Sequence, residues 1–326
     1  MEYADKITLE HVSFIYSQGT PFEKQALADV SLSIKAGKIT GIIGRTGSGK
    51  STMMQLFNGL AAPTSGRVLL DGVDINARLE DVYEERKDDP CYAHFSRRKI
   101  KKAIREQLNE LRRTLCFRVG LVMQYPEHQL FEETVERDIS FGPRNMGLTE
   151  EEITSRVLEA ARFTELPEEL LKQSPFDLSG GQRRRVAIAG IMAMRPEVLV
   201  LDEPAAGLDP QGRDYILNGI FEYQRKTGCT VLIVSHSMED MARYCDDLIV
   251  LSEAKVVMQG PSEEIFSHAE ELTAIGLDVP QITHLMHRLH MEGAPVPEHV
   301  YTVDAAVNAL YEMLSANSEK RGGARA

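Results

Sequence analysis

Apolar and polar positions divide the chain into strand-like and helix-like segments. Residues 6–16 and 26–44 are β-rich, with rough alternation and a break at Ala36-Gly37. Three later runs are almost continuously apolar, as is typical of central strands buried on both faces of a parallel sheet. These runs are residues 119–124, 198–202 and 229–235. Because helical patterns separate the runs, the sequence predicts an α/β fold.

A charged segment at residues 77–115 interrupts this alternation. Residues 77–95 are acidic and show no clear period, whereas residues 96–115 place apolar side chains at helical spacing among Arg and Lys. The apolar positions are Ile100, Ile104, Leu108, Leu111 and Leu115. This basic amphipathic helix has two interpretations. Either its apolar stripe packs on its own domain, or the helix contacts acidic lipid headgroups or an acidic partner surface.

The pattern beyond Pro261 is helical and indicates a small appendage. Two apolar stripes are present, and they define the faces along which the appendage is expected to pack. They consist of Ile282, Leu285, Met286 and Leu289, and of Val303, Ala306, Val307, Leu310 and Leu314. We therefore expect a main domain at 1–262, a helical appendage at 263–315 and a disordered tail at 316–326.

Composition narrows the class of protein. The 326 residues are 43 % hydrophobic and 26 % charged, which is ordinary for a globular protein. No apolar run approaches the ~20 residues of a membrane-spanning helix, and no N-terminal signal segment is evident. We therefore expect a cytosolic protein, or one held on a membrane by partners. The net charge of −12 argues against nucleic acid as the main partner.

Cysteine and histidine positions add no metal chemistry. The four cysteines have no Cys-x-x-Cys spacing, so reduced and mostly packed thiols are expected. His284, His287 and His290 follow an i, i+3, i+6 spacing, but no Cys or acidic cluster joins them. A surface or interface position is therefore expected for these histidines.

Residues 44–51 have the phosphate-binding pattern GxxxxGK[ST]. Their glycines allow a tight turn that directs backbone N–H groups at phosphate oxygens, and a helix start follows the loop. Lys50 is expected to reach the β- and γ-phosphates, and Ser51 to ligate Mg²⁺. The residues expected around the phosphates are Gly44, Arg45, Thr46, Gly47, Ser48, Gly49, Lys50, Ser51 and Thr52.

The apolar run 198–202 ends in two carboxylates, Asp202 and Glu203. A parallel strand delivers both to the sheet edge that also carries the phosphate loop. Asp202 fits a role at Mg²⁺, and Glu203 is placed to polarise a water that attacks the γ-phosphate.

Leu178-Ser179-Gly180-Gly181-Gln182 precedes a helical segment and predicts a second anion site at a helix N-terminus. With this motif the sequence resembles the ATP-binding cassette (ABC) family, whose signature is LSGGQ. The resemblance implies a P-loop ATPase fold: a RecA-like mixed sheet, an antiparallel β part and an inserted helical subdomain at about 125–190. It also implies that Ser179, Gly180, Gly181 and Gln182 close on the ATP of a second subunit.

Other family positions match one by one. Gln124 resembles the Q-loop glutamine that contacts Mg²⁺ and the lytic water. Asp209, in Ala206-Gly207-Leu208-Asp209, resembles the D-loop residue at the dimer interface, and His236 resembles the switch histidine that senses the γ-phosphate. Tyr16 fits the aromatic that stacks on adenine, with Phe22 as the competing candidate.

Residues 122–147 indicate a branch of the family. The segment Tyr-Pro-Glu-His-Gln-Leu-Phe-Glu-Glu-Thr-Val is similar to the second of the two paralogous ATPases of energy-coupling factor (ECF) vitamin transporters. Residues 276–285 resemble the same group, in which the helical appendage strengthens the ATPase dimer. The charged segment at 77–115 is longer than expected for the group.

The resemblance implies an ATP-hydrolysing subunit, peripheral on the cytoplasmic face of the cell membrane. It would power uptake of vitamins or other micronutrients. Its partners would be a paralogous ATPase, a transmembrane scaffold and a substrate-binding membrane protein.

Three alternatives remain beside this assignment. The first is a cobalt or nickel importer ATPase that pairs with itself. The second is a soluble ABC protein of DNA repair or translation, although that class usually has two cassettes or a long coiled coil. The third, a nucleotide-binding module without turnover, is disfavoured by Glu203 and His236.

Overall fold

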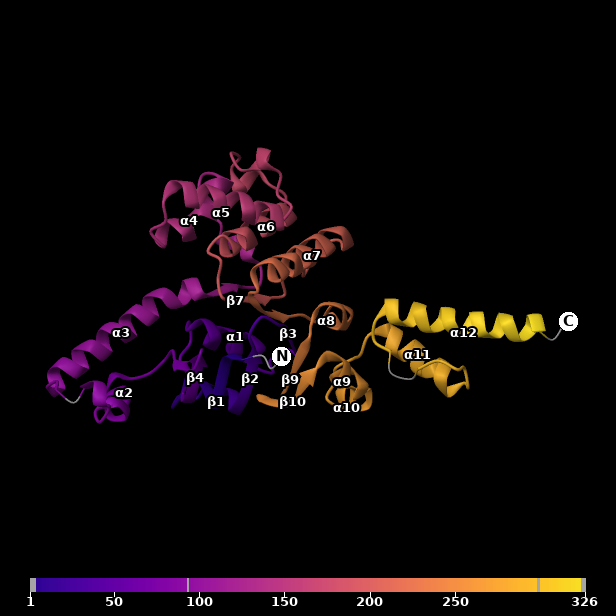
Figure 1. Cartoon of the computed structure of the whole chain (residues 1–326), viewed down its shortest axis with the longest axis horizontal. Helices are drawn as coiled ribbons and strands as arrows, with labels where there is room; N and C mark the ends of the chain where they lie inside the picture. Colours follow the sequence, from indigo (N-terminus) through magenta and orange to yellow (C-terminus); the bar gives the residue numbers. More distant parts are fainter. Residues whose placement is uncertain (1–3, 93, 298–299, 324–326) are drawn as a thin grey trace.

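The computed structural model describes residues 4–92, 94–297 and 300–323. Two sheets and several groups of helices make up the chain (Figure 1). The first sheet is antiparallel, with strand order β2-β1-β4-β5. Its strands are β1 (Asp5–Tyr16), β2 (Lys24–Lys35), β4 (Ser65–Leu70) and β5 (Val73–Asp74). The predicted α/β fold with an antiparallel β part is therefore confirmed.

The second sheet has strand order β10-β9-β3-β8-β7-β6, and only β10 runs antiparallel to its neighbour. Its strands are β3 (Ile39–Gly44), β6 (Val119–Val122), β7 (Val198–Asp202), β8 (Thr230–Val234), β9 (Asp247–Ser252) and β10 (Lys255–Pro261). The three continuous apolar runs of the sequence form β6, β7 and β8, the last of which begins one residue after the predicted run. They lie side by side at one end of this sheet.

The apolar runs are continuous because both faces of this sheet are covered. Val198 and Val200 of β7 pack toward the antiparallel sheet and helix α1 (Lys50–Asn58). Leu199 and Leu201 pack on the opposite face against α5, α6 and α7. Successive strand residues therefore enter two different cores, which leaves no position for a polar residue.

Helices α4 to α6 form a separate layer above the parallel sheet in Figure 1. These helices are α4 (Val135–Asn145), α5 (Glu150–Phe163) and α6 (Gly180–Met192). A side chain caps the N-terminus of each helix. Thr134, Thr149 and Ser179 accept hydrogen bonds from backbone N–H groups of the first turn. Helix α7 (Pro210–Thr227) covers the sheet below this layer, and α8 (Met238–Tyr244) follows β8.

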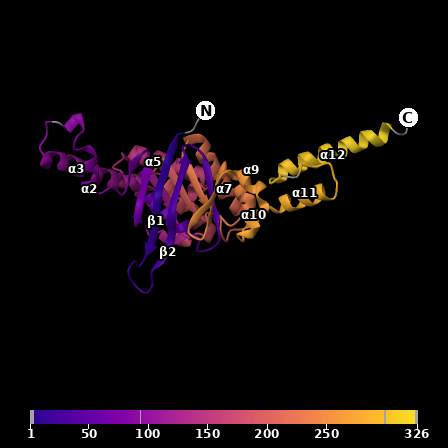
Figure 2. The ribbon, with the colours of Figure 1, turned by 90° about the horizontal axis from the view of Figure 1, so that it is seen from below.

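Helices α2 (Leu79–Arg86) and α3 (Arg97–Arg118) pair as a helical hairpin. The hairpin stands away from the body, at the end of the molecule opposite the C-terminal helices (Figures 1 and 2). Its core consists of Tyr83, Ile100 and Ile104. Helix α2 lies within residues 77–95, for which the sequence shows no clear period, and its Leu79, Val82 and Tyr83 pack against α3.

In the described part of the chain after β10, four helices are present: α9 (Ser262–Ser267), α10 (Ala269–Ala274), α11 (Gln281–Met291) and α12 (Val303–Gly323). Met286, Val296, Val300 and Ala306 form a small core between α11 and α12. Helix α12 extends into the segment 316–326 for which the sequence predicts disorder. Residues 1–3 of the predicted main domain and 324–326 of the predicted tail lie outside the described residues.

Candidate functional site

The phosphate loop connects β3 to α1. Every residue of β3 is buried, so the strand holds the start of the loop rigidly in the sheet. Gly49 has the left-handed φ of 109°, and a Cβ there would collide with the carbonyl oxygen of Ala26. Only glycine satisfies both conditions, which explains the residue at this point of the motif.

Lys50 begins α1, with its side chain inside the loop. Its Nζ donates hydrogen bonds to the carbonyl oxygens of Gly44 at 2.6 Å and Arg45 at 3.1 Å. Burial lowers the pKa of Lys50, and the charges of Glu203 and Asp202 partly oppose that shift. The ammonium therefore lies where the sequence predicts phosphate oxygens, and its hydrogen bonds among the described residues go to uncharged carbonyl oxygens.

Strand register brings the chemical groups to one edge of the sheet. Ile42 of β3 and Asp202 of β7 are both paired with Val234 of β8, so three carboxyl ends lie in one row. Beyond that row the chain supplies the phosphate loop after β3, Glu203 after β7 and His236 after β8. Crevices at the carboxyl ends of parallel strands are common ligand sites in α/β proteins.

Glu203 has an unusual backbone conformation for a residue with a side chain. Its φ is +52°, and its N–H donates to the carbonyl oxygen of Val234 at 3.0 Å. The side chain is largely buried, with Oε1 lying 3.4 Å from His236 Nε2. Oε1 accepts no hydrogen bond from the described residues. Burial raises the pKa of Glu203, His236 acts against that shift, and the neighbouring Asp202 adds to it.

Ser51 and Asp202 fit a magnesium ion. The Ser51 hydroxyl donates to Asp202 Oδ2 at 3.0 Å, so two hard oxygen donors from different elements converge on one point. Magnesium in proteins typically takes one or two such ligands, together with phosphate oxygens and water. Burial raises the pKa of Asp202, although the hydrogen bond from Ser51 opposes that rise.

A cavity of about 340 Å³ collects most of the sequence-predicted residues. Residues from four strand ends and from α1 line it, as expected for a site at the switch point of an α/β sheet. The predicted residues that line it are Tyr16, Thr46, Gly47, Gly49, Lys50, Ser51, Thr52, Gln124, Asp202, Glu203 and His236. Gly44, Arg45 and Ser48 complete the loop behind this lining.

Tyr16 and Phe22 differ in their relation to this cavity. Tyr16 lies on its wall, where its hydroxyl forms a hydrogen bond of 2.9 Å with Thr52 Oγ1. Its ring packs edge-to-face on Phe14 at 4.8 Å. Phe22 lies in the turn between β1 and β2, is 84 % exposed and does not line the cavity. The geometry therefore favours Tyr16 as the aromatic next to a bound base.

The LSGGQ residues do not line this cavity. They begin α6 in the helical layer, where Ser179 and Gln182 form a reciprocal capping box. Position 180 faces open space, and a Cβ at Gly181 would lie 3.5 Å from Leu208 Cδ2. Asp209 also does not line the cavity. Its carboxylate caps α7 by accepting a hydrogen bond of 2.6 Å from the Gly212 N–H.

Sequence reasoning missed several residues around the site. Lys24 also lines the cavity, and Arg213 of α7 binds Ser237 and Asp240 just beyond His236. No local pattern indicates either residue, because each reaches the site only through tertiary packing. A buried ion pair between Glu127 and Arg184 links the segment after Gln124 to the signature helix at 3.0 Å. Glu127 lies in the segment 122–147 that the sequence singled out and Arg184 lies in the helix after LSGGQ, but their pairing has no sequence signal.

The three histidines of α11 lie away from the cavity. His284 pairs with Asp278 at 2.7 Å, and His290 Nδ1 lies 2.8 Å from the Val296 carbonyl oxygen. Within the described part of the chain, no three His, Cys, Asp or Glu side chains are grouped as a metal site. Of the four free cysteines, Cys229 and Cys245 are buried whereas Cys91 and Cys116 are exposed, so the expectation of mostly packed thiols is wrong for two.

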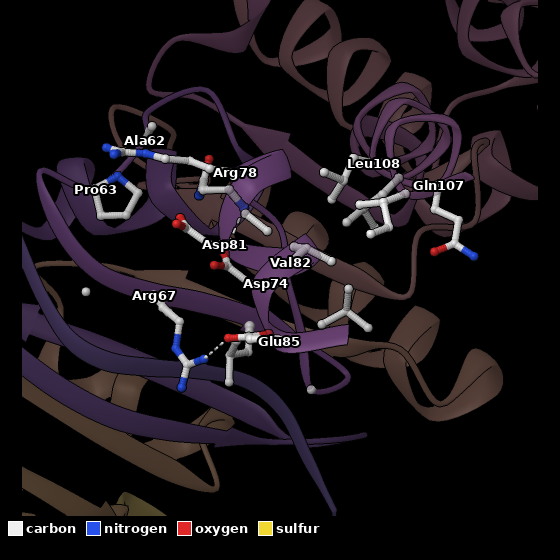
Figure 3. Close-up of a pocket in the computed structure, with 18 of the residues that line it drawn as sticks. Ala62, Pro63, Arg67, Asp74, Arg78, Asp81, Val82, Glu85, Gln107 and Leu108 are labelled. Carbon is white, nitrogen blue, oxygen red and sulfur yellow. Dashed lines mark hydrogen bonds and ion pairs between the residues drawn. The ribbon is translucent and has the colours of Figure 1, made fainter. Parts of the chain in front are cut away.

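A further cavity of about 660 Å³ lies where the α2–α3 hairpin meets β4 and β5 (Figure 3). Arg67 and Glu85 form an ion pair of 3.6 Å within it. None of the sequence-predicted site residues lines this cavity.

A family model described as "ABC transporter" matches residues 27–206. The fold and the site thus define an ATP-binding, ATP-hydrolysing protein of the ABC transporter class. A solved structure of CbiO1 from Clostridium perfringens, described as part of the ABC transporter complex cbiONQ, is 37 % identical. It covers 87 % of this chain and 99 % of that one, with a TM-score of 0.64.

Curated relatives define the branch. The energy-coupling factor transporter ATP-binding protein EcfA2 of Caldanaerobacter subterraneus is 47 % identical over 94 % of this chain and 97 % of that protein. The EcfA2 protein of Clostridium perfringens is 45 % identical over 96 % of this chain and 99 % of that protein. The chain belongs to this family of energy-coupling factor transporter ATP-binding proteins. Among residues 4–92, 94–297 and 300–323, no helix is both long and apolar enough to span a bilayer.

Proposed function

We propose that this chain is one of two ATPase subunits that close around ATP to drive an ECF-type importer. One observation carries the proposal. The phosphate loop, the Asp202-Glu203 strand end, Gln124 and His236 share one cavity, whereas the LSGGQ residues lie outside it in the helical layer. Each chain therefore has one half of an ATP site and, at a different surface, the complementary half for a partner.

ATP binding uses the loop and its flanks. Backbone N–H groups of residues 44–51 and the Lys50 ammonium hold the phosphates, which suits a lysine now bonded only to neutral carbonyls. Tyr16 stacks on the adenine, where a flat ring gives contact without base-specific hydrogen bonds. Lys24, on the same wall, adds a positive charge near the nucleotide.

Ser51 and Asp202 would hold Mg²⁺, with Gln124 approaching from the end of the segment after β6. When bound, the ion supplies positive charge to the β- and γ-phosphate oxygens. This chain's residues keep the two oxygen donors next to each other. Pairing of β7 with β8 fixes Asp202, and the start of α1 fixes Ser51.

Hydrolysis is an in-line attack of water on the γ-phosphorus. A bond forms between the water oxygen and phosphorus as the bond to the ADP oxygen breaks, giving ADP and phosphate. Glu203 orients the water and accepts its proton, and His236, 3.4 Å from Glu203 Oε1, would contact the γ-phosphate. The raised pKa of Glu203 is appropriate for a general base, because a more basic carboxylate accepts a proton more readily.

A second subunit completes the site. The Ser179–Gln182 turn presents the N-terminus of α6, with an open surface at Gly180, as expected for a surface that receives another subunit's phosphates. Since ATP would then contact both subunits, the closed pair binds it more tightly than the open pair, and binding energy drives closure. The similarity to EcfA2 proteins supports a paralogous partner rather than a second copy of this chain.

Closure is transmitted through Gln124 and the residues after it. Exposed Phe131 and Phe141 pack edge-to-face at 4.9 Å on the helical layer beyond Gln124, leaving an aromatic surface for a membrane subunit. The chain would therefore lie on the cytoplasmic face of the membrane, held by a transmembrane scaffold and working with a substrate-binding membrane protein that takes up vitamins or other micronutrients.

Affinity purification of the tagged chain from detergent-solubilised membranes tests this function. The proposal predicts a second, related ATPase, one membrane scaffold and small membrane proteins among the co-purifying chains. The likeness to CbiO1 makes a cobalt or nickel importer the second candidate. Recovery of only a self-paired ATPase with metal-importer subunits would favour that candidate and contradict the ECF assignment.

A further inference from the structure

The α2–α3 hairpin is the part of the chain that the ATPase function leaves unexplained. Its apolar stripe is already used: Ile100 and Ile104 of α3 are buried against Tyr83 of α2. The first sequence interpretation of this helix, packing on its own domain, is therefore confirmed for the stripe. An amphipathic helix that inserts its apolar face into a bilayer is excluded for the same reason.

A basic face remains on the exposed side of α3. Arg98, Lys102 and Arg105 recur at i, i+4 and i+7, which places them on one face of the helix, and all three are exposed. Within the described chain, Arg98 and Arg105 have no ion-pair partner, and Lys102 has only a loose contact of 3.8 Å with Glu106. Their positive charge is thus available to a ligand.

The hairpin holds this face away from the acidic body. At its base, Arg67 pairs with Glu85 at 3.6 Å (Figure 3), and Arg112 donates to the Ala77 carbonyl oxygen at 3.0 Å. The tip projects beyond the sheets (Figures 1 and 2). The chain's net charge of −12 would repel an anionic surface. Charges farther than about 8–10 Å away are largely screened at physiological salt, so a projecting basic face can act independently.

Charge and an exposed aromatic side chain indicate which surface the basic face meets. The C-terminal end of α3 leads into β6, whereas the basic face occupies the first turns of the helix, toward the free end of the hairpin. Phe95, 53 % exposed, lies just before the helix and adds an aromatic side chain of the kind enriched at bilayer interfaces. We propose that the basic face of α3 docks electrostatically on anionic lipid headgroups beside the transporter. This inference rests on the proposed membrane location of the chain.

Vesicle co-sedimentation of the full-length chain tests the proposal directly. The vesicles are phosphatidylcholine alone, or equimolar phosphatidylcholine and phosphatidylglycerol. We expect binding only to the anionic vesicles, with loss at high salt. The combined variant Arg98→Gln, Lys102→Gln and Arg105→Gln should lower the partition coefficient by about tenfold or more. Glutamine is a good helix former, so the hairpin should persist, and circular dichroism checks this.

A matched control removes three exposed charges elsewhere, by Arg162→Gln, Lys172→Gln and Lys255→Gln. This control should bind anionic vesicles as the unmodified chain does. Equal binding to both vesicle types, equal loss in both triple variants, or binding that resists high salt would each overturn the proposal. Retention on duplex DNA without binding to anionic vesicles would overturn it in favour of a nucleic-acid site. ATP binding, measured separately on the same variants, should stay unchanged, so failure of docking is distinguishable from failure of the ATPase assignment.

Discussion

Glu203 and His236 face each other across the carboxyl ends of β7 and β8, with 3.4 Å between Glu203 Oε1 and His236 Nε2. The left-handed backbone of Glu203 and its N–H bond to the Val234 carbonyl oxygen hold the carboxylate toward β8. Strained backbone at a site of this kind is maintained by the surrounding structure and is frequent at functional positions. The pair is therefore a fixed feature of the sheet edge.

His236→Ala should lower the rate of ATP hydrolysis by about tenfold to a hundredfold while leaving ATP affinity nearly unchanged, because the imidazole lies beside Glu203, the proposed general base. Turnover and nucleotide binding of the purified transporter provide the two readouts. His284→Ala, on α11, is the control and should leave turnover unaffected. An unchanged turnover in His236→Ala would remove this histidine from the reaction.

Arg213 positions the segment that carries His236. Its Nη2 donates to Ser237 Oγ at 2.5 Å, and its Nε donates to Asp240 Oδ2 at 3.0 Å. Arg213→Ala should reduce the turnover number by about tenfold with little change in KM. Arg213→Lys should restore part of the loss, because it keeps the positive charge but lacks the planar guanidinium that can bind both Ser237 and Asp240. Lys226→Ala, at the far end of α7, serves as the control. Equal turnover in Arg213→Ala and Lys226→Ala would show that Arg213 has no positioning role.

The buried pair of Glu127 and Arg184 should dominate the local stability of the helical layer. Their side chains are 13 % and 4 % exposed, and Arg184 also donates to the carbonyl oxygen of Ala206. Glu127→Ala leaves a buried guanidinium without its carboxylate, so the free energy of unfolding should fall by about 3 kcal/mol in urea titration. The surface pair of Glu159 and Arg195 offers the comparison, and Glu159→Ala should cost less than about 1 kcal/mol. Similar losses in both variants would contradict the buried-pair account.

Glu197 should make stability sensitive to acid. Hydrogen bonds from Arg118 at 2.8 Å and Lys6 at 2.7 Å lower the pKa of Glu197 to about 2, although burial opposes the shift. A carboxylate with a lower pKa in the folded state stabilises the fold above its unfolded pKa of about 4.5 and loses that contribution as pH falls toward about 2. Because the side chain is 42 % exposed, screening reduces this contribution to about 1 kcal/mol.

Urea unfolding of Glu197→Gln tests that prediction. The variant should be less stable than the unmodified chain at pH 7, and the gap should narrow steadily below about pH 4. Glu222→Gln, which removes an exposed pair with Lys226 on α7, should show almost no gap at any pH. A gap for Glu197→Gln that stays constant down to pH 3 would contradict the assigned pKa.

The sequence was sufficient to predict those parts of the fold and site whose motif lies within one strand, loop or helix. The run ending at Asp202 could be predicted as a buried strand because both of its faces are apolar. The phosphate loop could be predicted because its glycines are needed by the backbone, as the positive φ and close contacts of Gly49 show. The helix α2 was missed because its few apolar residues gain stability only from Ile100 and Ile104 across the hairpin. Tertiary packing also brings Lys24 and Arg213 to the site, so no local pattern predicts them.

The most direct test of the central claim is ATP turnover by the intact transporter that contains Glu203→Gln in this chain. Glutamine preserves the shape of the side chain but cannot accept the proton of the attacking water. The account predicts that hydrolysis at this site falls by about a hundredfold or more while ATP still binds and holds the two ATPase subunits together. Near-normal hydrolysis in this variant would contradict the role assigned to Glu203, and with it the mechanism built on the shared cavity.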